Sequence, residues 1–302
     1  MGTTFRVVLY ATDKEGAKKA ADAAFARVAE LDGIMSDYKK DSELMKLCRT
    51  SGEDVPVSAD LFAVLTAADK LSIASDGAFD VTVGPVVQLW RIARRTQQLP
   101  DAKELAAARS KVGYRHVQLD AAKRTVRLRL PGMQLDLGGI AKGYAADEAL
   151  KVLRDKHQIT RALVAAAGDI TCGDPPPDKP AWDVDIAPIA KGQKPRRLKL
   201  ANAAVSTSGD IEQFVEIAGV RYSHVVDPKT GLGMTGRRGA TVIAKNGVTA
   251  DSMTKAVLLM PPEKVLALVE ATPDAAAYIV IVGEKEKLAI TASKRFNQFV
   301  AD

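Results

Sequence analysis

An acidic residue, a pair of glycines and an alanine-rich run follow one another at residues 134–146, with the sequence QLDLGGIAKGYAA. The apolar residues before the glycines are typical of a strand end, and the run after them favours a helix. A helix that opens at such a turn presents free backbone N–H groups, and its dipole favours an anion. The segment therefore predicts a strand–turn–helix unit that suits a phosphate, with Asp136 and Lys142 beside it. An ordinary connection, in which glycine only permits the turn, is the alternative.

Strand and helix patterns are interleaved along the rest of the chain. Residues 77–85, bounded by glycine and proline, favour an extended segment that ends in a turn. Helical spacing is found at residues 16–36, from 41, and at 59–75, 86–95, 101–110, 249–260 and 262–270. Strands are predicted at residues 5–10, 115–119, 124–130, 161–167, 182–187, 204–208, 212–217, 221–226, 239–244 and 278–282. This order indicates an α/β or α+β fold.

The composition is that of a globular protein. Of 302 residues, 47% are hydrophobic and 26% are charged, which argues against disorder over most of the chain. The net charge of +6 is mild, aromatic residues make up only 5%, and no nucleic-acid motif is present, so we expect no nucleic-acid partner. One basic stretch predicts a solvated loop or, alternatively, a docking surface for an acidic partner. Its members are Lys191, Lys194, Arg196, Arg197 and Lys199.

The small numbers of cysteines and histidines limit the kinds of site that the chain can form. Cys48 and Cys172 are too few for a disulfide framework, and we expect buried free thiols, although one bridge remains open. With three histidines in the chain, a histidine metal cluster is improbable. No apolar run approaches the ~18 residues of a membrane span, so we expect no transmembrane segment. No signal peptide is visible at the N-terminus.

A second candidate site is the segment ADSMTKA at residues 250–256. Asp251, Thr254 and Lys255 share one face of the expected helix. The carboxylate and hydroxyl are oxygen ligands suited to Mg²⁺, whereas the lysine offers a charge. An ordinary Asp–Lys pair near a helix start explains the same pattern. Asp80 and His224 are weaker candidates, since turn chemistry or a structural histidine accounts for each.

Taken together and in order, these segments resemble the ApbE-type flavin transferases. The resemblance rests on MGTTF, DYKKDSELMKL, GAFDVTVGPVVQLW, LDLGGIAKGYAAD, AAGDI, STSGDIEQF, RYSHVVDPKTG and TADSMTKAV, which run from Met1 to about Met260. It implies a compact α+β domain of the family's own type over residues 1–302, with mixed sheets, flanking helices and FAD in a cleft. A division into two lobes is left open.

The resemblance also implies a reaction. Enzymes of this kind cleave the FAD pyrophosphate with a divalent metal, Mg²⁺ being the expected one, and transfer FMN to a threonine or serine hydroxyl of a target protein while AMP leaves. The acceptor is expected to be a subunit of a membrane redox complex. Two alternatives remain: an FAD pyrophosphatase that gives FMN and AMP, and a protein that binds FAD without turnover.

Site residues follow from the resemblance position by position. It puts Gly139 and Asp251 at the metal, and the hydroxyl of Thr254 on the same helix face is a further expected ligand. The residues expected in catalysis are Asp136, Asp251 and Lys255. The expected flavin contacts are Met1, Tyr38, Ala78, Phe79, Asp80, Asp136, Lys142 and His224.

Lys255 departs from the family pattern, because it replaces the threonine that usually binds the metal. In one hypothesis its ammonium group supplies part of the metal's charge and the enzyme has weak or altered metal dependence. In the other the metal site is lost and FAD is bound without turnover.

The resemblance further implies an export or lipoprotein signal upstream of MGTTF. We therefore expect a periplasmic protein, or one anchored on the outer face of the membrane, whose signal is absent from this sequence. A cytoplasmic protein is the alternative.

Overall fold

The seven strands of the central sheet come from both ends of the chain and from its middle. The computed structural model describes residues 2–188, 195–209 and 214–301. The strand order is β1-β5-β6-β9-β13-β14-β15, and each neighbouring pair is antiparallel. The bounds are β1 Phe5–Leu9, β5 Ala162–Ala166, β6 Asp169–Cys172, β9 Ala203–Gly209, β13 Arg237–Ala244, β14 Ala276–Val282 and β15 Leu288–Ala292.

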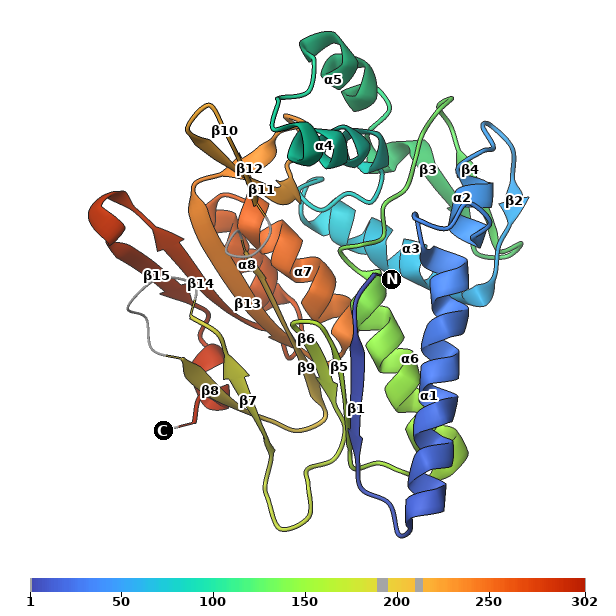
Figure 1. Cartoon of the computed structure of the whole chain (residues 1–302), viewed down its shortest axis with the longest axis vertical. Helices are drawn as coiled ribbons and strands as arrows, with labels where there is room; N and C mark the ends of the chain where they lie inside the picture. Colours follow the sequence, from blue (N-terminus) through green and yellow to red (C-terminus); the bar gives the residue numbers. More distant parts are fainter. Residues whose placement is uncertain (1, 189–194, 210–213, 302) are drawn as a thin grey trace.

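Helices cover one face of this sheet (Figure 1). Helix α6 (Ala141–His157) packs on β5 and β6, α7 (Gly247–Leu259) packs on β9 and β13, and α1 (Lys14–Met35) packs on α6. The buried alanines of α6 allow this close approach, because a methyl group keeps neighbouring backbones near one another. Helix α8 (Pro262–Ala271) packs on α7 and β14.

The opposite face is covered by a hairpin and the C-terminal turn. Strands β7 (Trp182–Ile186) and β8 (Arg196–Leu200) pair with each other, and their inward residues join Phe296 of the turn η3 (Phe296–Phe299) in a second core. The outward residues Arg197 and Lys199 form ion pairs with Asp185 and Asp183 of β7. The basic stretch, predicted as a loop, is therefore a strand from Arg196 onward, while Lys191 and Lys194 lie outside the described residues.

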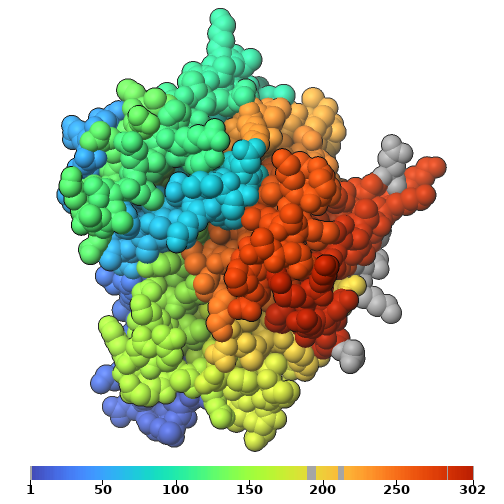
Figure 2. Space-filling model, turned by 180° about the vertical axis from the view of Figure 1, so that it is seen from behind, coloured from blue at the N-terminus to red at the C-terminus, as the bar shows by residue number. Residues whose placement is uncertain are grey.

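Smaller elements are grouped at the N-terminal end of α6 and pack with the C-terminal half of α7. They are α2 (Glu43–Leu47), α3 (Ala59–Ala74), α4 (Gly84–Thr96), α5 (Ala102–Arg109), the sheet β2-β4-β3 (Val55–Pro56, Thr125–Leu128, Val117–Asp120) and the sheet β10-β11-β12 (Phe214–Ile217, Val220–Val226, Gly233–Thr235). Figure 2 shows α3, in cyan, lying across the back of the molecule, with α6, in yellow-green, on one side and the other small elements on the opposite side.

One predicted extended segment is wrong. Residues 77–85 contain no strand apart from a single bridge between Val83 and Gln134, because the carboxylate of Asp80 folds the segment into a turn. It accepts hydrogen bonds from the backbone N–H and the hydroxyl of Thr82 at 2.8 and 2.7 Å. The prediction also missed β2, β6, β8, β12 and β15, which are short or strongly charged.

Cys48 and Cys172 are buried and free, as expected. Within the described ranges, no helix is long and apolar enough to cross a membrane.

Candidate functional site

Helices α6 and α7 begin side by side, and their backbones touch. A Cβ atom on Gly143 would lie 2.0 Å from the carbonyl oxygen of Gly247, so only glycine fits at this crossing. Asp147 of α6 fixes the start of α7 by accepting hydrogen bonds from the N–H groups of Gly247 and Val248 at 2.6 and 2.9 Å. The crossing brings the first turn of α6 against Asp251 of α7.

Asp251 is fully buried at this crossing. Its carboxylate accepts a hydrogen bond from the N–H of Gly143 at 3.1 Å and contacts the ammonium groups of Lys142 and Lys255. Burial alone would raise the pKa of Asp251, but the two lysines and the N–H together hold it below its ordinary value. Asp251 is therefore an ionised, fully paired carboxylate.

Lys142 connects Asp251 to a second buried carboxylate. Its ammonium nitrogen lies 3.3 Å from Asp251 and 3.2 Å from Asp169, and it donates to the carbonyl of Gly138 at 2.9 Å. Burial opposes the charged form, yet the two carboxylates raise the pKa of Lys142 above its ordinary value. Asp169 lies at the start of β6 and accepts a hydrogen bond from the hydroxyl of Ser206. Burial, followed by the neighbouring Asp251, raises the pKa of Asp169.

The side chain of Lys255 lies across the glycine turn. A Cβ on Gly139 would meet its Cγ and Cε at 3.4 Å and its Cδ at 3.5 Å. The ammonium group beyond this stem donates to the backbone carbonyl of Asp251 at 2.9 Å and to the Asp251 carboxylate. The predicted Asp251–Lys255 pair one helical turn apart is therefore present, and it borders Gly139.

Thr254 belongs to the same helix but faces another way. Its hydroxyl donates to the carbonyl of Asp251 at 2.7 Å and lies 2.9 Å from the hydroxyl of Ser208 on β9. The side chain is fully buried against the sheet. The structure therefore does not place this hydroxyl with the carboxylate of Asp251.

Asp136 lies on the other side of the glycine turn. Its carboxylate accepts a 2.8 Å hydrogen bond from the N–H of Gly138 and forms a 3.1 Å ion pair with Arg91 of α4. Arg91 also pairs with Asp37, and its guanidinium lies 4.3 Å from the centre of the Tyr38 ring. Burial, followed by the Asp37 carboxylate, raises the pKa of Asp136. The carboxylate keeps some exposure, and the Tyr38 ring is 70% exposed.

The segment 78–81 runs alongside Asp136. The N–H of Asp136 donates to the carbonyl of Val81 at 2.7 Å. Ala78, Phe79 and Asp80 are all buried, and Asp80 also accepts a 2.8 Å hydrogen bond from the N–H of Tyr114. Burial raises the pKa of Asp80. Asp80 therefore holds the local turn, as turn chemistry alone would predict.

The remaining predicted flavin contacts are His224 and Met1. His224 is partly buried on β11, a strand that packs against α4. Met1 lies outside the described residues.

Sequence reasoning did not assign two residues that complete the site, Asp169 and Arg91. Asp169 follows the strand 162–166 in the sequence AAGDI, so the motif was visible although its partner Lys142 was not. Arg91 is an ordinary residue of an amphipathic helix until the fold brings Asp37 and Asp136 to it.

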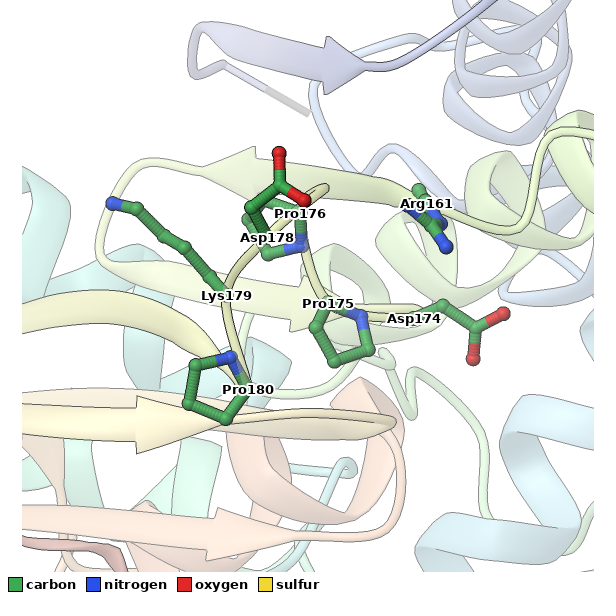
Figure 3. A pocket seen from close by; sticks show the side chains of 7 residues that line it. All are labelled: Arg161, Asp174, Pro175, Pro176, Asp178, Lys179 and Pro180. Atoms are coloured by element: carbon green, nitrogen blue, oxygen red, sulfur yellow. The ribbon is translucent and has the colours of Figure 1, made fainter.

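A surface pocket of about 500 Å³ lies elsewhere in the fold. Figure 3 shows that its walls come largely from the proline-rich loop after β6, with Arg161 and Asp174 at one end. This loop is at the opposite end of the β5–β6 hairpin from Asp169, since Ala166 pairs with Asp169 and Leu163 with Cys172. The pocket contains none of the predicted site residues.

Almost the whole chain is similar to known proteins. The model of the ApbE family matches residues 1–279. The chain belongs to the ApbE family. An FAD:protein FMN transferase of Klebsiella pneumoniae (strain 342) is 30% identical over 99% of this chain and 87% of the relative. An FAD:protein FMN transferase of Treponema pallidum (strain Nichols) is 33% identical over 93% of this chain and 82% of the relative.

The fold agrees with that of solved ApbE proteins. The flavin transferase ApbE from Vibrio cholerae superimposes with a TM-score of 0.87 at 30% identity, covering 99% of this chain and 96% of that one. The α+β fold expected from the resemblance is therefore confirmed.

The divalent metal expected from the ApbE resemblance does not fit the residues present. Both oxygens of the Asp251 carboxylate are engaged by N–H or ammonium donors, and the Thr254 hydroxyl faces Ser208. Mg²⁺ needs a near-octahedral set of oxygen ligands, whereas Lys255 presents a cation. No group of three or more His, Cys, Asp or Glu side chains within the described part of the chain could hold a metal.

Proposed function

We propose that this chain is an FAD:protein FMN transferase. The observation that carries the proposal is its likeness, over at least nine-tenths of its length, to curated ApbE proteins of that name. The reaction breaks the pyrophosphate bond of FAD. The hydroxyl oxygen of an acceptor threonine or serine forms a bond to the phosphorus of the FMN half, and AMP leaves with the other phosphate.

The clusters around the glycine turn support this chemistry. Phosphoryl transfer depends mainly on positioning and on neutralising the charge of the phosphates. The cations Arg91, Lys142 and Lys255 lie around the glycine turn, and the resemblance gives Asp136 and Lys142 among the residues that contact the flavin. We propose that these groups, rather than a bound metal, offset the pyrophosphate charge.

Asp136 is better suited than Asp251 to receive the proton of the acceptor hydroxyl. A base must reach the incoming hydroxyl and bind a proton near the working pH. Asp136 is partly exposed and its pKa is raised, whereas Asp251 is fully buried, paired and of lowered pKa. We propose that Asp136 takes this proton and that Asp251 positions Lys142 and Lys255.

Incubation with FAD and a candidate acceptor domain tests the function. The expected result is AMP in solution and FMN covalently bound to a threonine or serine of the acceptor, detected by mass spectrometry. FMN and AMP without a labelled acceptor would favour a pyrophosphatase. Bound FAD with no AMP under any condition would favour a flavin-binding protein.

Two finer parts of the proposal rest on the family resemblance. We propose that the acceptor is a subunit of a membrane redox complex, and that the protein works in the periplasm or anchored on the outer face of the membrane. Fractionation of cells that express the complete gene, with detection of the protein in each fraction, tests the location.

A further inference from the structure

The site holds a cation of its own where the family resemblance leads us to expect a metal. Lys255 replaces the metal-binding threonine of the family pattern, and its stem lies within about 3.5 Å of a Cβ position on Gly139. Its ammonium group contacts the carboxylate of Asp251. The lysine therefore fills the space between the two groups, Gly139 and Asp251, that the resemblance assigns to the metal.

The surroundings of Lys255 are built for an ammonium ion. Its side chain is only 15% exposed, so its charge must be compensated inside the protein. The carboxylate and the backbone carbonyl of Asp251 accept its hydrogen bonds. Asp169 and Asp251 carry two negative charges, and Lys142 and Lys255 carry two positive charges, so the four groups are balanced. A dication added here would lie beside two ammonium ions.

We propose that the ammonium group of Lys255 takes the place of the divalent cation, so that the chain binds FAD without Mg²⁺. This inference rests on the proposed function for the identity of the ligand. A lysine neutralises a phosphate as a point charge and needs no octahedral ligand set. Restoring the threonine by Lys255→Thr removes the ammonium and returns a hydroxyl ligand, which creates a dependence on Mg²⁺.

The first test measures FAD affinity by titration, in EDTA and in millimolar Mg²⁺, with three variants. The wild-type affinity is expected to be the same in both buffers. Lys255→Thr should bind FAD about tenfold more weakly in EDTA and recover in Mg²⁺, whereas Lys255→Met, which offers neither charge nor oxygen, should be about tenfold weaker in both. Lys245→Thr, at an exposed lysine just after β13, is the matched control and should behave as the wild type.

The second test uses Mn²⁺ alone, without FAD, and measures free Mn²⁺ by electron paramagnetic resonance. The wild type should bind no Mn²⁺ in the millimolar range, and Lys255→Thr should bind one ion. Circular dichroism establishes whether each variant is folded. If a variant is unfolded, the wild-type titrations still test the proposal.

Several results would overturn the inference. These are loss of wild-type FAD binding in EDTA, one Mn²⁺ bound by the wild type, or a Lys255→Thr protein whose FAD affinity Mg²⁺ does not restore.

Failure of the proposed function gives other results. A wild type that binds FAD in EDTA but transfers no FMN leaves the inference standing, and a wild type that binds no FAD still leaves the Mn²⁺ titration to decide it.

Discussion

The backbone N–H of Gly143 donates a 3.1 Å hydrogen bond to the carboxylate of Asp251. This bond lies where α6 and α7 touch backbone to backbone, and it adds a main-chain donor to the two lysines that hold the buried charge. The position of Asp251 therefore depends on the absence of a side chain at residue 143.

We predict that Gly143→Ala destabilises the protein by about 3 kcal/mol or more, because the new methyl group would lie 2.0 Å from the carbonyl of Gly247. Urea unfolding followed by circular dichroism measures the loss. Gly33→Ala is the matched control, since Gly33 is an exposed position in α1 with nothing within 4 Å of a Cβ atom. That change should stabilise by roughly 0.5–1 kcal/mol. Equal effects of the two changes would contradict the backbone contact.

Asp251→Asn should cost about 3–5 kcal/mol of unfolding free energy at pH 7, because it leaves Lys142 and Lys255 with one buried carboxylate, Asp169, between them. The pKa of Asp251 is lowered in the folded state, so its contribution is complete above the ordinary carboxyl pKa and is lost as the pH falls through the folded value. The deficit should therefore shrink in strong acid. Asp54→Asn, at a solvent-exposed pair with Arg127, should leave the unfolding free energy nearly unchanged.

The Asp147 carboxyl has the opposite pH dependence. Burial raises its pKa to about 6, more than the N–H groups of Gly247 and Val248 lower it. Such a group stabilises the fold fully below its unfolded pKa, and this stability is lost as the pH rises through 6. We expect unfolding free energy to fall by at most about 3 kcal/mol between pH 4 and 7 from this group. Urea unfolding across this range should show a smaller fall for Asp147→Asn; identical slopes would exclude the raised pKa.

Tyr38→Ala should weaken FAD binding by about tenfold, because an exposed aromatic ring beside the site offers a stacking surface worth ~1–3 kcal/mol to a flat ligand. The ring is 70% exposed, so unfolding free energy should change by less than about 0.5 kcal/mol. Fluorescence titration of FAD measures the affinity. Phe25→Ala, at a 41% exposed ring of α1, is the control and should leave FAD affinity unchanged. An equal loss in both variants would speak against stacking.

Local patterns predicted the parts of the site that lie close together in sequence. The glycine turn at 138–139, the helix after it and the Asp251–Lys255 pair all follow from spacing within one or two helical turns. The loop predicted for the basic stretch failed because Arg197 and Lys199 occupy the outward positions of a strand whose inward residues are buried. In this five-residue strand the charged side chains hide the alternation of buried and exposed positions.

The long-range partners were beyond reach of the sequence alone. Asp169 meets Lys142 only because the β5–β6 hairpin and α6 pack together, and Arg91 meets Asp136 only because α4 packs beside the glycine turn. The prediction that free backbone N–H groups at the glycine turn suit a phosphate was wrong in part. Two of those donors, Gly138 and Gly143, bond the carboxylates of Asp136 and Asp251.

Asp136 and its neighbour Asp37 both form ion pairs with Arg91, but only Asp136 is proposed to take the proton. If Asp136 accepts the acceptor's proton, Asp136→Asn should slow AMP release and FMN transfer by about a hundredfold or more. FAD affinity should fall by much less than the rate, because Arg91 keeps its ion pair with Asp37. The wild-type rate should rise with pH through the raised pKa of Asp136, and this rise should be absent from the variant.

Asp37→Asn should keep the reaction but move the rise in rate to lower pH, because the Asp37 carboxylate is a cause of the raised pKa of Asp136. Rate measurements across the acid range, with FAD at saturation, test both changes. An Asp136→Asn enzyme that retains the wild-type rate and pH profile would assign the proton to another group. A rise that stays in place in Asp37→Asn would show that Asp136 does not set it.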